Sequence, residues 1–257
     1  MKLFALLLAA AVTIAAAPAT VKVQVNRRVI EVPLEKYVAA VLAGEASVFR
    51  SDEALKAMSV AARTYAIRMR GRHQAEGFDF CVTTHCQRVD LDGANTNLRF
   101  QKIAAGTAGE LLWYRGKLAF TPYSLDCGGR TEDVSAVWPD EAAPYLRSRP
   151  DEFCMRAGAS DWHWTGDAAA IANALRKQRL NAPAHLTGMR ISERTASGRA
   201  HLLQLSGDGA VPISASAFRF AIGRELGWNT LRSDRFDAHS AAGKISFDGR
   251  GSGHGVG

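Results

Sequence analysis

After its first twenty residues, the chain lacks any apolar run long enough to cross a bilayer, which takes about 20 consecutive apolar residues. It also lacks internal repeats, low-complexity linkers and the paired Cys-x-x-Cys spacing typical of strong zinc motifs. Its Lys and Arg residues give a net charge of +7, but they are scattered rather than clustered. These absences argue against an integral membrane protein and against nucleic acid as a partner. The basic surface instead suits an anionic partner, such as a bacterial wall polymer or a phospholipid surface.

The start of the chain differs from the rest. Met1 and Lys2 form a short basic region, residues 3–17 are apolar, and residues 17–19 are small enough for cleavage. This pattern predicts a secretory signal peptide over residues 1–19, with an uncleaved anchor or a hydrophobic first helix as the alternatives. We therefore expect residues 20–257 to be exported, to the periplasm or cell envelope.

The cysteines are even in number: Cys81, Cys86, Cys127 and Cys154. In an exported protein, which meets an oxidising compartment, an even number of cysteines favours disulfides. The simplest arrangement is Cys81–Cys86 and Cys127–Cys154, although four cysteines allow three pairings.

The first cysteine pair also has the composition of a metal site. His85 lies between Cys81 and Cys86, and His73 is available as a fourth ligand. Thiolate and imidazole ligands suit tetrahedral zinc, but the exported context favours a Cys81–Cys86 disulfide, and free thiols are a third alternative. We expect no cofactor to be required for catalysis, and any zinc at this site to be structural.

Apolar periodicity predicts an α+β fold. Alternating valines on either side of Asn26–Arg28 predict a β-hairpin, and helical spacing follows from Leu34 to a stop at Gly44. Ser51 is expected to cap a long central helix, Asp52–Gly71. Further along, we expect a hairpin within 111–120, helices at 167–178 and 214–226, strands at 189–192, 200–206 and 244–247, and an inserted helical and β subdomain at about 161–213. Together, residues 20–257 are expected to form one catalytic domain.

Glu45 is the most informative single residue. It follows the apolar stretch that begins at Tyr37, and poor hydration there holds the carboxyl proton more tightly than in water. A glutamic acid protonated near neutral pH can donate a proton to a glycosidic oxygen. The alternative is that Glu45 caps the neighbouring helix or pairs with Arg63 or Lys56.

Several local patterns resemble the SpoIID/LytB-domain family of bacterial peptidoglycan lytic transglycosylases. In chain order, these patterns are residues 37–47 around Glu45, the helix Glu53-Ala-Leu-Lys-Ala-Met-Ser-Val-Ala-Ala-Arg-Thr-Tyr-Ala66, the segment 81–87, the segment 123–138 with Gly128-Gly129-Arg130-Thr131-Glu132, and the glycine-rich end 249–257. The resemblance thus covers nearly all of residues 21–257. It rests mainly on the helix and the closing motif together.

The resemblance implies roles for individual residues. Glu45 stands where the family has its catalytic glutamate, and Tyr123 and Ser124 correspond to cleft residues. Arg63, in the helix motif, and His254, exposed between two glycines, complete the predicted substrate-binding set. The alternatives are a half-buried tyrosine beside a glycine loop and an ordered turn histidine. A structural zinc site is a feature of some members of the family.

The implied reaction is non-hydrolytic cleavage of the β-1,4 bond between N-acetylmuramic acid and N-acetylglucosamine, with formation of a 1,6-anhydro ring. One alternative is a non-catalytic module that grips glycan and recruits or stimulates a cell-wall amidase. Another is a hydrolytic muramidase, which needs a second carboxylate, with Asp126, Glu132 and Asp133 as candidates. The family is named for sporulation, but related domains also occur in bacteria that do not sporulate.

The sequence departs from the family pattern in two places. Ala46-Ser47 follows the glutamate where the family often has Met-Pro. The chain also stops inside the glycine-rich motif, which predicts a truncated C-terminus and puts one wall of the expected cleft in doubt.

Overall fold

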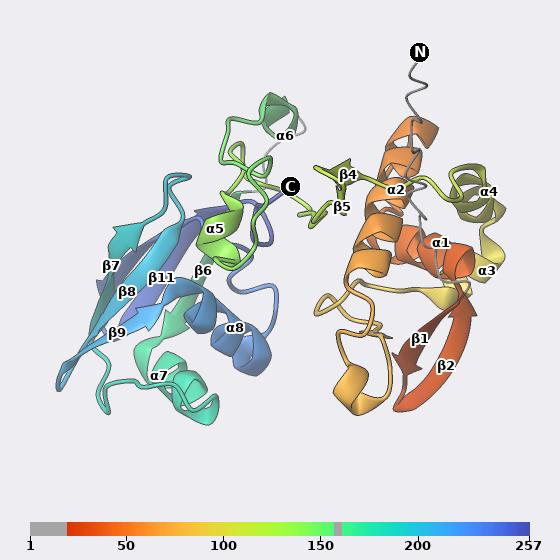
Figure 1. Ribbon diagram of the computed structural model, residues 1–257. Helices are drawn as coiled ribbons and strands as arrows, with labels where there is room; N and C mark the ends of the chain where they lie inside the picture. Colours follow the sequence, from red (N-terminus) through yellow and green to blue (C-terminus); the bar gives the residue numbers. More distant parts are fainter. Residues whose placement is uncertain (1–19, 157–160) are drawn as a thin grey trace, which may run out of the picture. The chain divides into compact units, whose positions relative to one another are not determined.

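The computed structural model describes residues 20–156 and 161–257 (Figure 1). The predicted signal peptide, residues 1–19, lies outside the described residues. The chain divides into two units, Met1–Thr121 and Pro122–Gly257, and both contain helices and strands. The α+β prediction is therefore confirmed. Within the described part of the chain, no helix is both long and apolar enough to span a membrane.

The first unit opens with the predicted hairpin. Strands β1 (Thr20–Val25) and β2 (Arg28–Pro33) pair antiparallel, and Asn26 and Arg27 form the turn with φ of 48° and 65°. Strand β3 (Phe80–Cys81) runs parallel to β1 on its other side. Hydrogen bonding to β1 thus fixes the start of the segment that carries Cys81.

Helices α1 (Leu34–Glu45) and α2 (Asp52–Arg68) supply most of the core of this unit. Ser51 caps α2 as predicted, with its hydroxyl accepting from the Ala54 N–H. Although α2 is the longer helix, α1 is more completely buried, because α2, α3 (Leu91–Thr96) and α4 (Leu98–Gly106) all pack against it. A short 3-10 helix η1 (Gln74–Glu76) and the predicted hairpin β4 (Trp113–Tyr114) and β5 (Lys117–Leu118) complete the unit.

The second unit is built on two three-stranded sheets in its described part, ordered β10-β11-β6 and β7-β8-β9. In chain order its elements are α5 (Val134–Val137), α6 (Glu152–Arg156), β6 (Asp161–Asp167), α7 (Ala168–Lys177), β7 (Gly188–Arg194), β8 (Ala200–Ser206), β9 (Ala210–Ser214), α8 (Ala215–Leu226), β10 (Phe236–Ala241) and β11 (Lys244–Arg250). Helices α7 and α8 pack together and share one core with both sheets (Figure 1).

This shared core bears on the predicted insertion at 161–213. Strand β6 pairs along its whole length with β11, and Trp162, Leu205, Phe218 and Phe247 belong to one buried cluster. Residues 161–213 therefore have no core separate from the residues that follow them. The sequence does not reveal this pairing, because the partner of β6 lies about 80 residues further along the chain, where local patterns give no signal.

Candidate functional site

Glu45 is the last residue of α1, so the helix runs through Gly44 instead of stopping there. Its carboxylate is half-buried, and Oε1 accepts a hydrogen bond from the Arg88 backbone N–H at 2.7 Å. Burial raises the pKa of Glu45, and this effect outweighs the opposing effects of the Arg88 hydrogen bond and charge. The carbonyl end of the helix dipole acts in the same direction as burial.

The alternative roles of Glu45, as a helix cap or as an ion-pair partner of Arg63 or Lys56, belong to other residues. The N-cap of α2 is Ser51, Arg63 pairs with Glu35, and Lys56 pairs with Glu53. Among the described residues, Oε2 of Glu45 has no hydrogen-bond partner. The side chain is therefore held by one oxygen, which leaves the other available to carry a proton.

Gly44 explains how Arg88 reaches the glutamate. A Cβ atom at position 44 would lie 2.4 Å from the Arg88 carbonyl oxygen, so only glycine lets the two backbones approach this closely. The neighbouring Gln87 is buried, accepts the Tyr37 hydroxyl at 3.0 Å and donates to the Ala62 carbonyl at 3.4 Å. Sequence reasoning missed Arg88 and gave Gly44 the wrong role, because a backbone contact between distant segments leaves no periodic pattern.

Gly44→Ala is expected to push residue 88 away and remove its hydrogen bond to Glu45. The expected result is faster hydrogen exchange of the Arg88 amide, measured in the intact protein, with the overall fold retained. Gly106→Ala is the matched control, because Gly106 also lies in the last turn of a helix and a Cβ there meets nothing within 4 Å. Unchanged protection at Arg88 in Gly44→Ala would show that this glycine does not position the contact.

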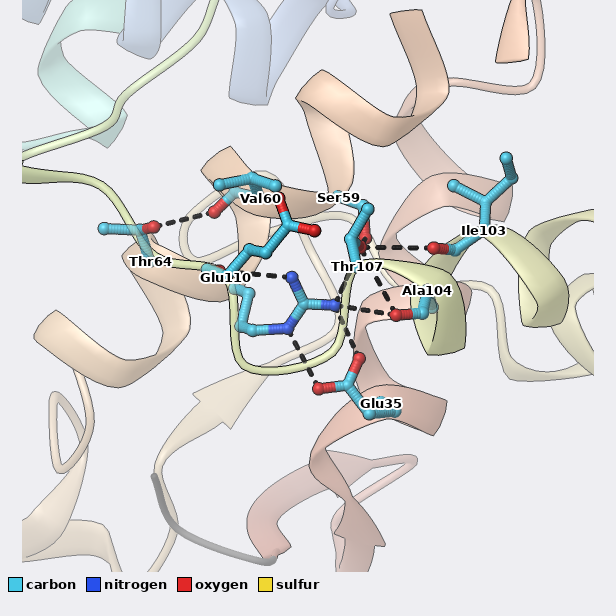
Figure 2. Close-up of polar contacts among 9 residues, drawn as sticks. Glu35, Ser59, Val60, Thr64, Ile103, Ala104, Thr107 and Glu110 are labelled. Carbon is cyan, nitrogen blue, oxygen red and sulfur yellow. Dashed lines mark hydrogen bonds and ion pairs between the residues drawn. The ribbon is translucent and has the colours of Figure 1, made fainter. Parts of the chain in front are cut away.

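Arg63 does not have the predicted substrate-binding role. Its side chain is fully buried in α2, and Nε and Nη2 bind the two carboxylate oxygens of Glu35 at 2.9 and 2.6 Å. The same guanidinium donates to the carbonyls of Ala104 and Glu110 and to Thr107. Figure 2 shows these three residues and Glu35 gathered around the shared polar contacts. Arg63 therefore ties α1, α2 and α4 together and is not accessible to a ligand.

The other predicted substrate-binding residues all lie in the second unit. Ser124 Oγ donates to the Ser252 carbonyl at 2.9 Å and accepts from the Gly255 N–H at 3.1 Å. Tyr123 is half-buried next to it. The structure thus brings Tyr123 and Ser124 together with the glycine-rich end, whereas Glu45 belongs to the first unit.

His254 is not the exposed imidazole that its flanking glycines indicate. Its ring is packed against Trp138 with 4.8 Å between centroids, and Nδ1 accepts from the Val256 N–H. Burial, with repulsion from Arg219 and Arg199, lowers its pKa to about 4, so the ring is neutral at pH 7. The glycines serve the backbone, since Gly253 and Gly255 have φ of 90° and 78°.

The carboxylates considered for a hydrolytic mechanism are all engaged within the second unit. Glu132 is buried and accepts from the hydroxyls of Thr195 and Ser197 at 2.6 and 2.8 Å. Asp133 caps α5 through Ser135, and Asp126 accepts from the Gly128 N–H. These contacts give each of the three carboxylates a structural role.

His73, Cys81, His85 and Cys86 form a compact cluster in the first unit, with ligand atoms within 4.8 Å of one another. The Sγ atoms of Cys81 and Cys86 are 3.4 Å apart and both thiols are free, so the favoured disulfide is not formed in this structure. His73 Nε2 lies 3.3 Å from Cys86 Sγ, and His85 Nδ1 lies 3.8 and 3.6 Å from the two sulfurs.

These separations fit the tetrahedral-zinc alternative. With Zn–S near 2.3 Å and Zn–N near 2.1 Å, tetrahedral ligand atoms lie about 3.4–3.8 Å apart. The His73 Nδ1 also contacts the Glu76 carboxylate at 2.5 Å, as the outer carboxylate of a metal-bound histidine does. Burial raises the pKa of Cys81, but hydrogen bonds with Thr83, Cys86 and His85 outweigh it and bring the pKa to about 6. This lowered pKa favours the thiolate form of Cys81, which suits binding of a cation.

Comparison with known proteins identifies a family that matches the segment carrying these residues. Residues 23–114, which include Glu45, Arg88 and the Cys/His cluster, match the family described as SpoIID, stage II sporulation protein. This match supports assignment of the segment to the SpoIID family. The chain is also 26% identical over 246 residues to stage II sporulation protein D of Bacillus amyloliquefaciens, an alignment that covers 90% of this chain and 67% of the relative.

The chain is also similar to two further proteins. An uncharacterized protein of Brachyspira hyodysenteriae is 32% identical over 231 residues, covering 88% of this chain and 59% of the relative. The amidase enhancer of Bacillus subtilis is 37% identical over 101 residues, covering 39% of this chain and 13% of the relative. The chain thus spans only part of the length of its relatives.

Proposed function

We propose that this chain is an exported lytic transglycosylase of the SpoIID family that cleaves the β-1,4 bond between N-acetylmuramic acid and N-acetylglucosamine in peptidoglycan. The observation that carries the proposal is Glu45, a half-buried carboxylate with a raised pKa at the end of α1. Its position in the matched family segment supports the same conclusion. The test is the chemistry of the chain ends that the purified protein produces from purified glycan.

In this proposal one carboxyl group performs both proton transfers. Glu45 in its acid form donates a proton to the leaving glycosidic oxygen, and the bond to the muramoyl C1 breaks. The resulting carboxylate then accepts the proton of the muramoyl C6 hydroxyl as that oxygen bonds to C1 and closes the 1,6-anhydro ring. The sugar supplies its own nucleophile, so the reaction needs neither water nor a second carboxylate, unlike a typical glycosidase. The Arg88 N–H stabilises the carboxylate form between the two steps.

We further propose that His73, Cys81, His85 and Cys86 hold a structural zinc ion. When bound, zinc would neutralise the thiolates and cross-link the segment 81–86 to His73. Because Gln87 and Arg88 follow Cys86 directly, the cluster anchors the residues that reach Glu45. The chain itself supplies all four ligands, and Glu76 orients His73.

Cys86→Ser is expected to lose zinc from protein purified without chelator and to lower the midpoint of thermal unfolding. The matched control is Cys154→Ser, which lies outside this cluster and should keep one zinc per chain. Metal analysis combined with a free-thiol count makes the comparison. If wild-type protein contains no zinc and Cys81 and Cys86 resist alkylation until reduced, the first pair forms a disulfide and the zinc proposal is wrong.

A second function is favoured by the similarity to an amidase enhancer. In that case the protein would grip glycan strands without cutting them and would recruit or stimulate a cell-wall amidase. An assay that mixes purified amidase, glycan and Glu45→Gln protein distinguishes the two functions. Full stimulation of the amidase by this variant, with no glycan cleavage by wild-type protein, would favour the binding module.

A further inference from the structure

The second pair of cysteines, Cys127 and Cys154, meets where two segments of the second unit run side by side. The Thr131 N–H donates to the Arg149 carbonyl at 2.9 Å, and the Asp151 N–H donates to the Gly129 carbonyl at 3.0 Å. This backbone pairing brings the two thiols, both free in this structure, to the same end of a short ladder with their sulfur atoms within 4.8 Å of each other. The juxtaposition is therefore set by the backbone.

Each thiol also donates to a carboxylate. Cys127 Sγ lies 3.3 Å from Asp151 Oδ2, and Cys154 Sγ lies 2.7 Å from Asp126 Oδ1. Both carboxylates already have backbone partners. Asp151 Oδ1 accepts the N–H groups of Phe153 and Cys154 at the start of α6, and Asp126 Oδ1 accepts the Gly128 N–H. The hydrogen bonds to these carboxylates constrain the backbone of the two segments that carry the cysteines.

The environment of Cys127 and Cys154 differs from that of the Cys/His cluster in the first unit. There, two imidazoles accompany the thiols, whereas the group around Cys127 has no histidine among the described residues. Burial, together with the neighbouring Cys154 thiol and the Asp151 carboxylate, raises the pKa of Cys127 to about 12. A metal ion needs thiolates, which the adjacent carboxylates disfavour, whereas a disulfide carries no charge and suits this surrounding.

We propose that Cys127 and Cys154 are a disulfide site, and that in the exported protein a covalent bond joins the 126–130 loop to α6. The required oxidant is a disulfide compound, such as an oxidoreductase with an active-site disulfide. Cys154, the more exposed thiol, loses its proton and attacks that disulfide to form a mixed disulfide. Cys127 then attacks the Cys154 sulfur and releases the oxidant as a dithiol. Two protons and two electrons leave the pair, and one S–S bond forms in it.

The bond would reinforce the part of the second unit that holds the glycine-rich end. The Cys127 carbonyl accepts from Arg199 Nη2 at 2.7 Å, and the Gly128 carbonyl accepts from Arg235 Nη1 at 2.9 Å. On the other side of the loop, the Asp126 carbonyl accepts from the Ser252 N–H at 2.8 Å. The cross-link would thus tie α6 to a loop that is already bonded to residue 252.

The test compares the full chain before and after treatment with glutathione disulfide. Trypsin should release the peptides 118–130 and 148–156 joined by one disulfide, because the Arg149–Pro150 bond resists cleavage. The oxidised protein should unfold about 5–10 °C above the reduced protein. Cys127→Ser and Cys154→Ser should both abolish this difference, and Cys81→Ser/Cys86→Ser should keep it.

Three results would overturn the proposal. In the first, both thiols remain open to alkylation in the treated, denatured protein. In the second, either peptide is joined to the peptide 73–88, which carries the other two cysteines. In the third, Cys81→Ser/Cys86→Ser protein retains a zinc ion that is lost on adding Cys127→Ser. The comparison of oxidised with reduced wild-type protein requires no variant to fold.

Discussion

Glu45→Gln is expected to lower the rate of release of anhydro products from purified glycan by a factor of about 10²–10⁴, the usual contribution of a general acid or base. Glutamine keeps the size of the side chain, and its Oε1 can still accept the Arg88 N–H. It has no proton to donate to the glycosidic oxygen and cannot act as the base in the second step. Glycan binding, measured by co-sedimentation, should remain.

The matched control is Glu53→Gln. Glu53 is a highly exposed carboxylate on the first turn of α2, where it pairs with Lys56, and its loss should leave the rate unchanged. If Glu45→Gln released anhydro products at the wild-type rate, another residue would be the acid and the assignment would be wrong.

The stability of Glu45→Gln should depend on pH in a definite direction. Because the folded-state pKa of Glu45 is raised, folding favours its acid form. That contribution is fully present below the unfolded-state pKa and is lost as the pH rises through the folded-state pKa. Urea denaturation should therefore find the glutamine variant at least as stable as wild type at pH 7, with its relative advantage shrinking as the pH falls towards 4. A variant clearly less stable at pH 7 would contradict the buried-acid account.

Arg63→Met is expected to lower the free energy of unfolding by about 3 kcal/mol, because it leaves the partly buried Glu35 carboxylate and several buried hydrogen-bond acceptors without their partner. Methionine fills much of the volume but removes every donor of the guanidinium. Glu35 then loses its partner, and the carbonyls of Ala104 in α4 and Glu110 in the following segment lose the hydrogen bonds that join them to α2. Urea denaturation monitored by circular dichroism measures the change.

Lys56→Met is the control, because it makes the same kind of change on the exposed face of α2. It should leave the free energy of unfolding close to that of wild type. If Arg63→Met were equally harmless while glycan binding fell, Arg63 would contact substrate as the sequence predicts, and the structural role would be wrong.

Local features of the fold could be predicted from the sequence, and long-range contacts could not. The first hairpin, the Ser51 cap and the helices α2, α7 and α8 follow from spacing within about 20 residues. Strand β6 escaped prediction because its partner β11 lies far along the chain. The same limit explains why the burial of Arg63 was not predicted. Its position on a charged helix indicates exposure, but its partners come from α1 and α4, far away in the sequence.

The candidate site shows the same division. The apolar stretch from Tyr37 predicts an unusual carboxylate at Glu45, and the structure agrees, with its pKa raised by burial. The hydrogen bond from the Arg88 N–H and the close approach of Arg88 to Gly44 involve a segment more than 40 residues away, so only the structure reveals them. The histidine and cysteine types are visible in the sequence, but only the distances favour four ligands over a disulfide at Cys81 and Cys86.

Mass spectrometry of the products from purified glycan tests the central claim most directly. If Glu45 acts first as acid and then as base, the new muramic acid ends made by wild-type protein will be 1,6-anhydro ends, one water lighter than reducing ends, and Glu45→Gln will make almost none. Reducing ends would instead show hydrolysis. Intact strands bound by wild-type protein would show a glycan-binding module, and either outcome would contradict the proposed transglycosylase.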